Sequence, residues 1–189
     1  MTSKSFRRAH LRAPLMTSIL YVDDDYVHRC RSLNISKGGI LLGELPHIPE
    51  INALPIMFAL PEIPLFSKLL HHEILALNED QFHVDIVRVK ARMVRQFDKK
   101  QRLDAIFTKN IGCEFVKASE QTKDKIELYV QRMAKNTVFL LSLFENKAKS
   151  ETNLKVIRRV SRLLGYDEEE KLSLLRLKVL HDYQSLESL

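Results

Sequence analysis

The spacing of apolar residues changes at Ser119, and this change limits the fold of the 189-residue chain more than any other feature. Ahead of Ser119, apolar residues occur in short β-prone segments separated by turn residues, a pattern that favours an antiparallel barrel. After Ser119 they recur three and four residues apart, as one face of an α-helix requires. We therefore expect a mainly β fold with α, in which an antiparallel barrel is followed by a closing helix and an α-helical C-terminal extension.

The β part is expected to consist of short strands rich in Val, Ile, Tyr and Leu. Asp23-Asp24-Asp25 suits a hairpin turn at a solvated tip, which we favour over a site for a hard cation. All prolines except Pro14 fall between Leu45 and Pro64, where they exclude a helix. The expected strands cover residues 15–22, 26–33, 40–42, 55–60, 82–97 and 111–116.

Helices are expected after the barrel. The first is capped by Ser119 and continues to about Lys147. The second covers residues 154–164 and stops at Gly165, and the last opens at Asp167 with acidic residues in its first turn. Residues 138–144 are apolar on nearly all sides, so a neighbour besides the barrel must cover them. The helices either fold back on their own chain or form a homo-oligomer, and we favour self-association.

Composition favours anionic partners. The chain carries 30 Lys and Arg against 24 Asp and Glu, a net charge of +6. It has no secretory start and no run near the roughly 20 apolar residues of a membrane span, so we expect a soluble, cytoplasmic protein. Cys30 and Cys113 lie in strand-like sequence, which predicts reduced, buried thiols.

Two short strings near the start form a candidate ligand site. Arg7, Arg8 and Arg12 supply guanidinium groups, which hold phosphate oxygens or the O6/N7 edge of guanine through paired hydrogen bonds. The string 34–39 adds an amide, a hydroxyl and two glycines that let a ligand approach the backbone. Together they suit a ligand that is anionic and carries guanine.

The two strings resemble the signature of the PilZ domain, a family of small bacterial β-barrels that bind the second messenger cyclic di-GMP. Arg8 and Arg12 match RxxxR, and Asn34, Ser36 and Gly39 match [D/N]xSxxG, with Asn where many relatives have Asp. The resemblance covers residues 5–133 and includes similarity to the family's late strands and closing helix at residues 91–95, 111–115 and 126–130. It implies a PilZ-like barrel with an N-terminal arginine switch segment over residues 1–133. Residues 134–189 would then form an α-helical extension for oligomerisation or interaction.

The resemblance implies a non-catalytic receptor that binds cyclic di-GMP and needs no cofactor. The arginines would stack on guanine and hold phosphate, and the Asn and Ser side chains would hydrogen-bond to a guanine edge above the glycines of the turn. Binding would change the conformation of the N-terminal segment and signal to an unidentified protein target. The implied binding residues are Arg7, Arg8, Arg12, Asn34, Ser36, Gly38 and Gly39.

Two other functions stay open. The chain could be a nucleic-acid-binding module that uses basic residues in 132–149 and 155–162, or a degenerate PilZ scaffold that binds only proteins; we favour the messenger over nucleic acid. Enzyme motifs such as GxSxG, HExxH and CxxC are missing from the sequence, so we expect no catalysis. His71, His72 and Glu73 do not suit one metal ion, because adjacent side chains diverge, and we expect no metal site.

Overall fold

The fold is described from a computed structural model, which covers residues 10–51, 53–98, 109–145, 150–167 and 170–187. Its residues form two compact units. The barrel unit comprises Arg12–Pro61 and Val84–Val130, and the helical unit consists mainly of Glu62–His83 and the residues from Gln131 onward. The domain boundary that the sequence predicts at residue 133 stays a prediction.

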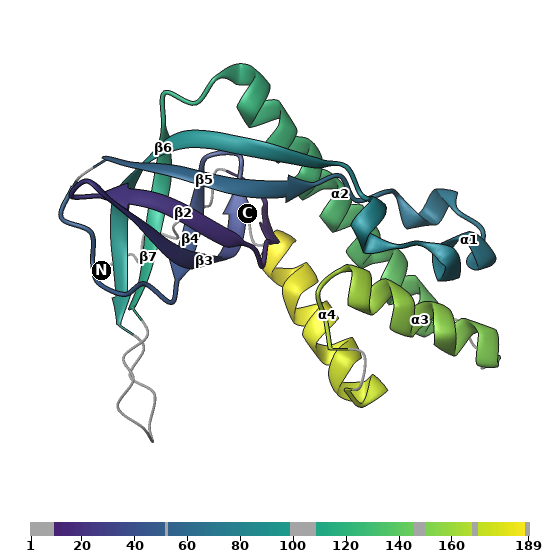
Figure 1. Cartoon of the computed structure of the whole chain (residues 1–189). Coiled ribbons are helices and arrows are strands. Elements are labelled where there is room, and N and C mark those ends of the chain that lie inside the picture. The colour runs from purple at the N-terminus through teal and green to yellow at the C-terminus, as the bar shows by residue number, and fades with distance from the viewer. Residues whose placement is uncertain (1–9, 52, 99–108, 146–149, 168–169, 188–189) are drawn as a thin grey trace. The chain divides into compact units, whose positions relative to one another are not determined.

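Seven antiparallel strands form the barrel unit (Figure 1). They are β1 (Arg12–Pro14), β2 (Ser18–Asp23), β3 (Tyr26–Ser36), β4 (Gly39–Gly43), β5 (Ala53–Pro61), β6 (Val84–Asp98) and β7 (Lys109–Val116). Strands β3, β2, β5, β6, β7 and β4 pair in that order, and a further pairing of β4 with β3 closes the ring. β1 adds to β3 as an extra strand. The predicted antiparallel barrel is thus confirmed.

Side chains alternate between the barrel interior and its outside, because successive residues of a strand point to opposite faces. In β2, Ile19 and Tyr21 are buried whereas Leu20 and Val22 are exposed. The predicted cysteines are also buried and free. Burial raises the pKa of both thiols, Cys30 and Cys113, to about 12, so they stay protonated and unreactive at neutral pH.

The turn between β2 and β3 confirms the predicted hairpin but not a solvated position for all three aspartates. Asp24 and Asp25 are exposed and have φ angles of 51° and 64°, as the central residues of a type I′ turn require. Asp23, in contrast, is only 1% exposed. The prediction is therefore wrong for Asp23, because this side chain turns into the protein from the last position of β2.

Asp23 holds the segment that connects β4 to β5. Its carboxylate accepts hydrogen bonds from His47 Nε2 at 3.0 Å and from the backbone N–H groups of Glu50 at 3.3 Å and Ile51 at 3.4 Å. Burial by itself would raise the pKa of Asp23, but these hydrogen bonds outweigh it and keep the pKa below its ordinary value. The ionised form of Asp23 therefore stabilises the fold.

Helix α2 (Glu120–Glu145) begins where the sequence predicts and has its first turns in the barrel unit. Ser119 caps it, because the Ser119 Oγ accepts a hydrogen bond from the Thr122 N–H at 3.2 Å. The Tyr129 hydroxyl donates to the carbonyl oxygen of Pro14 at 2.8 Å, and Ile126 is completely buried. These contacts fasten the start of α2 to the barrel beside β1.

The helical unit contains the second half of α2 and several shorter helices. They are the 3₁₀ turn Phe66–Lys68, α1 (His71–Ala76), the 3₁₀ turn Glu79–Gln81, α3 (Glu151–Leu163) and α4 (Leu172–Glu187). Buried Asn136 on α2 holds the segment ahead of α1: its Oδ1 accepts a hydrogen bond from the Phe66 N–H at 3.0 Å, and its Nδ2 donates to the Pro64 carbonyl at 2.8 Å. The sequence did not indicate α1, because six residues are too few to show a helical period.

The end of α3 agrees with the sequence prediction. Gly165 has a φ of 86°, and its N–H donates to the Arg162 carbonyl at 2.8 Å, as at other helices that end on a left-handed glycine. The predicted start of the last helix at Asp167 is wrong, since α4 begins at Leu172. Arg158 donates to the carbonyl of Glu170, so a side chain from α3 occupies a backbone group that the predicted helix would have used.

The apolar stretch 138–144 of α2 is only partly covered. Val138 on α2 is exposed while Leu140 and Leu143 are buried, and self-association through the helices stays a prediction.

Among the helices described, none combines the length and the apolar character needed to cross a membrane.

We expect Asp23→Asn to lower the free energy of unfolding at pH 7 by about 1 to 3 kcal/mol, because it removes the buried acceptor of three hydrogen bonds. Since the folded pKa of Asp23 is depressed, the wild type should lose the same stability as the pH falls below about 4, whereas the variant should not. Urea unfolding between pH 3 and pH 7 measures both effects. Asp24→Asn is the matched control, because exposed Asn tolerates a positive φ; equal losses in both variants would contradict a structural role for Asp23.

Candidate functional site

The register between β1 and β3 brings the two signature strings together. Arg12 lies directly opposite Ser36, and Pro14 lies opposite Asn34. Because direct partners in an antiparallel pair share one face, the side chains of Arg12, Asn34 and Ser36 lie on the same side of the β1–β3 pair. The intervening pair, Ala13 and Ile35, points the other way and is completely buried.

The three side chains differ in their exposure and partners. Arg12 is exposed and is the first residue of β1, so it lies at the end of the N-terminal segment that we expect to change conformation on binding. Ser36 is buried, and its Oγ donates to the Gly39 carbonyl at 3.3 Å. Asn34 is half-buried, and its amide finds no hydrogen-bond partner among the described residues. The Asn34 amide can therefore donate to and accept from the edge of a base.

The turn after Ser36 is fastened to two other elements. Lys37 Nζ lies 2.5 Å from Glu127 Oε2 on α2, and this hydrogen bond raises the pKa of the lysine. The carbonyl of Gly38 accepts a hydrogen bond from the Phe115 N–H of β7 at 2.9 Å. The turn is thus held by the first half of α2 and by β7.

Gly39 is required by the packing of the barrel itself. A Cβ at this position would lie 2.1 Å from the carbonyl oxygen of Cys113 in β7, far inside van der Waals contact with a backbone atom. Gly39 pairs with Glu114 in the β4–β7 ladder. The last glycine of the signature is therefore explained by close approach of two strands, in addition to any approach of a ligand.

Two carboxylates beside the turn pair with cations. Glu114, opposite Gly39, accepts a hydrogen bond from Arg92 Nε at 2.8 Å, and Glu127 pairs with Lys37. Asp124 and Glu120 also lie near Lys37 and contribute to its raised pKa, so the surface beside the turn carries charges of both signs.

Of the predicted binding residues, the structure brings Arg12, Asn34, Ser36, Gly38 and Gly39 to one end of the β1–β3–β4 region. Arg7 and Arg8 lie outside the described residues. The sequence did not single out the Lys37–Glu127 and Arg92–Glu114 pairs, because partners 90 and 22 positions apart leave no local signal. In the described ranges, no group of three or more His, Cys, Asp or Glu side chains could hold a metal ion.

The model of the PilZ domain family matches residues 6–132. The chain belongs to the PilZ domain family. The match covers both signature strings, all seven strands and the first half of α2. The sequence prediction of a PilZ-type barrel is confirmed.

Several solved structures resemble the PilZ chain at low identity. Inhibitor of motility MotI/DgrA from Bacillus subtilis is 17% identical over 67% of this chain, with a TM-score of 0.49. The PilZ domain of YcgR from Escherichia coli, solved with c-di-GMP, is 15% identical over 67% of this chain and 91% of its own, with a TM-score of 0.44. The MrkH–c-di-GMP complex from K. pneumonia is 14% identical over 76% of this chain and 56% of its own, with a TM-score of 0.43. This chain spans half of the MotI chain, and no curated protein matches it.

We expect Gly39→Ala to lower the free energy of unfolding by about 3 kcal/mol, because the methyl group must push β4 away from β7. Gly165→Ala is the matched control: nothing lies within 4 Å of its Cβ, so it should cost only about 1 kcal/mol of left-handed strain. Urea unfolding followed by circular dichroism measures both. If Gly39→Ala proved no more destabilising than Gly165→Ala, the close approach of the two strands would be contradicted.

Proposed function

We propose that the chain is a non-catalytic receptor for cyclic di-GMP. Its membership of the PilZ family supports this proposal, and the observation that carries it is the β1–β3 register, which places Arg12 and Ser36 opposite each other. An arginine and a serine that lie 24 positions apart in the sequence thereby form one surface. Such a surface offers a guanidinium and polar hydrogen-bonding groups to the same ligand.

The proposal gives each side chain a role in binding. Arg12, with Arg7 and Arg8, stacks on guanine and holds the phosphates, since a planar guanidinium can do both. Asn34 and Ser36 hydrogen-bond to a guanine edge. Gly38 and Gly39 leave the surface of the turn free of side chains, so that the base can rest on it.

The signal then passes from the turn to a protein target. Binding changes the conformation of the N-terminal segment that carries Arg7 and Arg8. It also acts on the Lys37–Glu127 pair, because a ligand phosphate competes with Glu127 for the same ammonium group. Since α2 continues from Glu127 into the helical unit, the target or a second copy of the chain would read the change at the helices.

The proposal places the protein in the cytoplasm of a bacterium, where free thiols such as Cys30 and Cys113 persist. Two alternatives compete with it: a nucleic-acid-binding module and a PilZ scaffold that binds only proteins. Duplex DNA should bind with an affinity that falls steeply with salt, whereas a ligand with two phosphates should lose affinity gently. A scaffold would bind neither.

We expect Arg12→Ala to weaken binding of cyclic di-GMP by about tenfold, because it removes a charge-assisted contact worth about 1.4 kcal/mol. The melting temperature of the free protein should change by less than about 2 °C, since the side chain is exposed. Isothermal titration calorimetry measures the affinity. Arg88→Ala on β6 is the matched control, because it removes an exposed arginine from the barrel away from the signature.

Two outcomes would contradict the proposal. If folded wild-type protein did not bind cyclic di-GMP at saturating concentration, a receptor function would be contradicted. If wild type, Arg12→Ala and Arg88→Ala bound cyclic di-GMP with equal affinity, a role of Arg12 in binding would be contradicted. Arg8→Ala, which should weaken binding in the same way, tests the part of the signature outside the described residues.

A further inference from the structure

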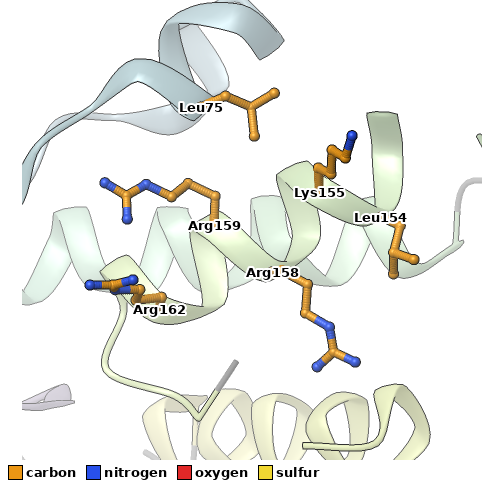
Figure 2. A pocket seen from close by; sticks show the side chains of 6 residues that line it. All are labelled: Leu75, Leu154, Lys155, Arg158, Arg159 and Arg162. Atoms are coloured by element: carbon orange, nitrogen blue, oxygen red, sulfur yellow. The ribbon is translucent and has the colours of Figure 1, made fainter. Parts of the chain in front are cut away.

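A hollow on α3 gathers cations that the proposed messenger site does not use. Its volume is about 490 Å³, and Leu75 of α1 forms part of its wall. Figure 2 shows the side chains that line it; those from α3 are Leu154, Lys155, Arg158, Arg159 and Arg162.

The cations line the hollow because of their spacing along α3. Positions 155, 158, 159 and 162 lie three and four residues apart, which places neighbouring members of the set on adjacent turns. The other face of the helix is packed inside the protein and consists of Val156, Ile157, Val160 and Leu163. The charged face of α3 is therefore held in place by an anchored apolar face.

Two of the arginines are already arranged around a carboxylate. Glu79 Oε1 lies 3.6 Å from Arg159 Nη1 and 3.2 Å from Arg162 Nε. Arg159 also donates to the Leu77 carbonyl, and Figure 2 shows it extending from α3 toward α1. Guanidinium groups held in this way lose less conformational entropy when an anion binds.

Among the described residues, four cationic side chains and no acidic side chain line the hollow. Glu79 lies beside two of them, Arg159 and Arg162, and Lys155 pairs with Glu151 at 2.8 Å. Arg158 donates to a neutral backbone carbonyl, so its charge is not compensated by that contact. The lining is thus able to attract an anion with more than one negative charge.

We propose that this hollow is the docking site for an acidic segment of a partner protein that also carries an aliphatic side chain. The cations would pair with carboxylates of the segment, as Arg159 and Arg162 already do with Glu79. Leu75 and Leu154 are 38% and 42% exposed in the wall of the hollow, and an aliphatic side chain of the partner would cover them. This inference does not depend on the binding of cyclic di-GMP.

The lining favours a protein segment over other polyanions. Nucleic acid would leave both leucines without a partner, and the lining contains neither aromatic side chains for stacking nor amides for reading bases. An anionic membrane would require an apolar helix face that can enter lipid, and the apolar face of α3 is buried. Charge complementarity together with exposed leucines fits an acidic, leucine-containing segment.

A display library of random 12-residue peptides, selected on the immobilised full-length chain, tests the proposal. We expect the selected peptides to be rich in Asp and Glu and to contain Leu, Ile or Val. Fluorescence anisotropy then measures the affinity of a synthetic consensus peptide at several salt concentrations. Duplex DNA of mixed sequence and vesicles containing phosphatidylserine are tested in parallel.

Matched variants distinguish binding in the hollow from a general effect of the protein's charge. We expect Lys155→Gln/Arg162→Gln to weaken peptide binding by about tenfold, since two partly exposed ion pairs are lost. Lys135→Gln/Lys171→Gln removes the same charge from exposed positions outside the lining and should change the affinity by less than about twofold. Leu154→Ser should weaken binding about fivefold without changing its salt dependence, because it removes apolar contact only.

Several results would overturn the proposal. The first is a selection that does not enrich acidic residues. The second is an equal loss of peptide affinity in the hollow variant and the control variant. The third is a peptide affinity that Leu154→Ser leaves unchanged. DNA or vesicles that bind more tightly than the peptide, with the loss confined to the hollow variant, would assign the hollow to phosphate instead. Melting temperatures of all variants within about 3 °C of wild type show that the comparison concerns binding and not folding.

Discussion

The pairing of β1 with β3 is the constraint on which the candidate site depends. In this register Ala13 and Ile35 point inward and are completely buried, while Arg12, Asn34 and Ser36 point to the other face. A slip by one residue would bury polar side chains and expose apolar ones. Burial of two apolar residues therefore fixes the position of three polar ones, so that the core of the barrel determines the geometry of the proposed ligand surface.

Contacts around the short strand strengthen this register. Ser32 Oγ donates to the Leu15 carbonyl at 2.5 Å, directly after β1, and the Tyr129 hydroxyl donates to the Pro14 carbonyl from α2. A strand of only three residues has few hydrogen bonds of its own, so these side chains supply much of its support. Within the signature, Ser36, Gly38 and Gly39 likewise serve the barrel through contacts to β4 and β7. The signature thus reflects the packing of the barrel as well as the proposed binding surface.

Local features of the fold could be predicted from the sequence. The hairpin at Asp24 and Asp25, the cap at Ser119 and the helix end at Gly165 depend on residues close together in the chain, and each is found where expected. The burial of Asp23 and the late start of α4 involve His47 and Arg158, partners from other segments that no local sequence pattern indicates. The signature residues were recognisable, whereas the Lys37–Glu127 pair and the wall that Leu75 adds to the α3 hollow required the folded chain.

The most direct measurement of the central claim is a chemical-shift map of the ¹⁵N-labelled protein during titration with cyclic di-GMP. Our account predicts that the amide signals of Arg12 and of residues 34–39 shift most, together with the guanidinium signal of Arg12. The signal of Asp24, in the turn between β2 and β3, should move little and serves as the internal reference. Shifts that cluster on other strands while the amides of Arg12, Ser36 and Gly39 stay in place would contradict the account.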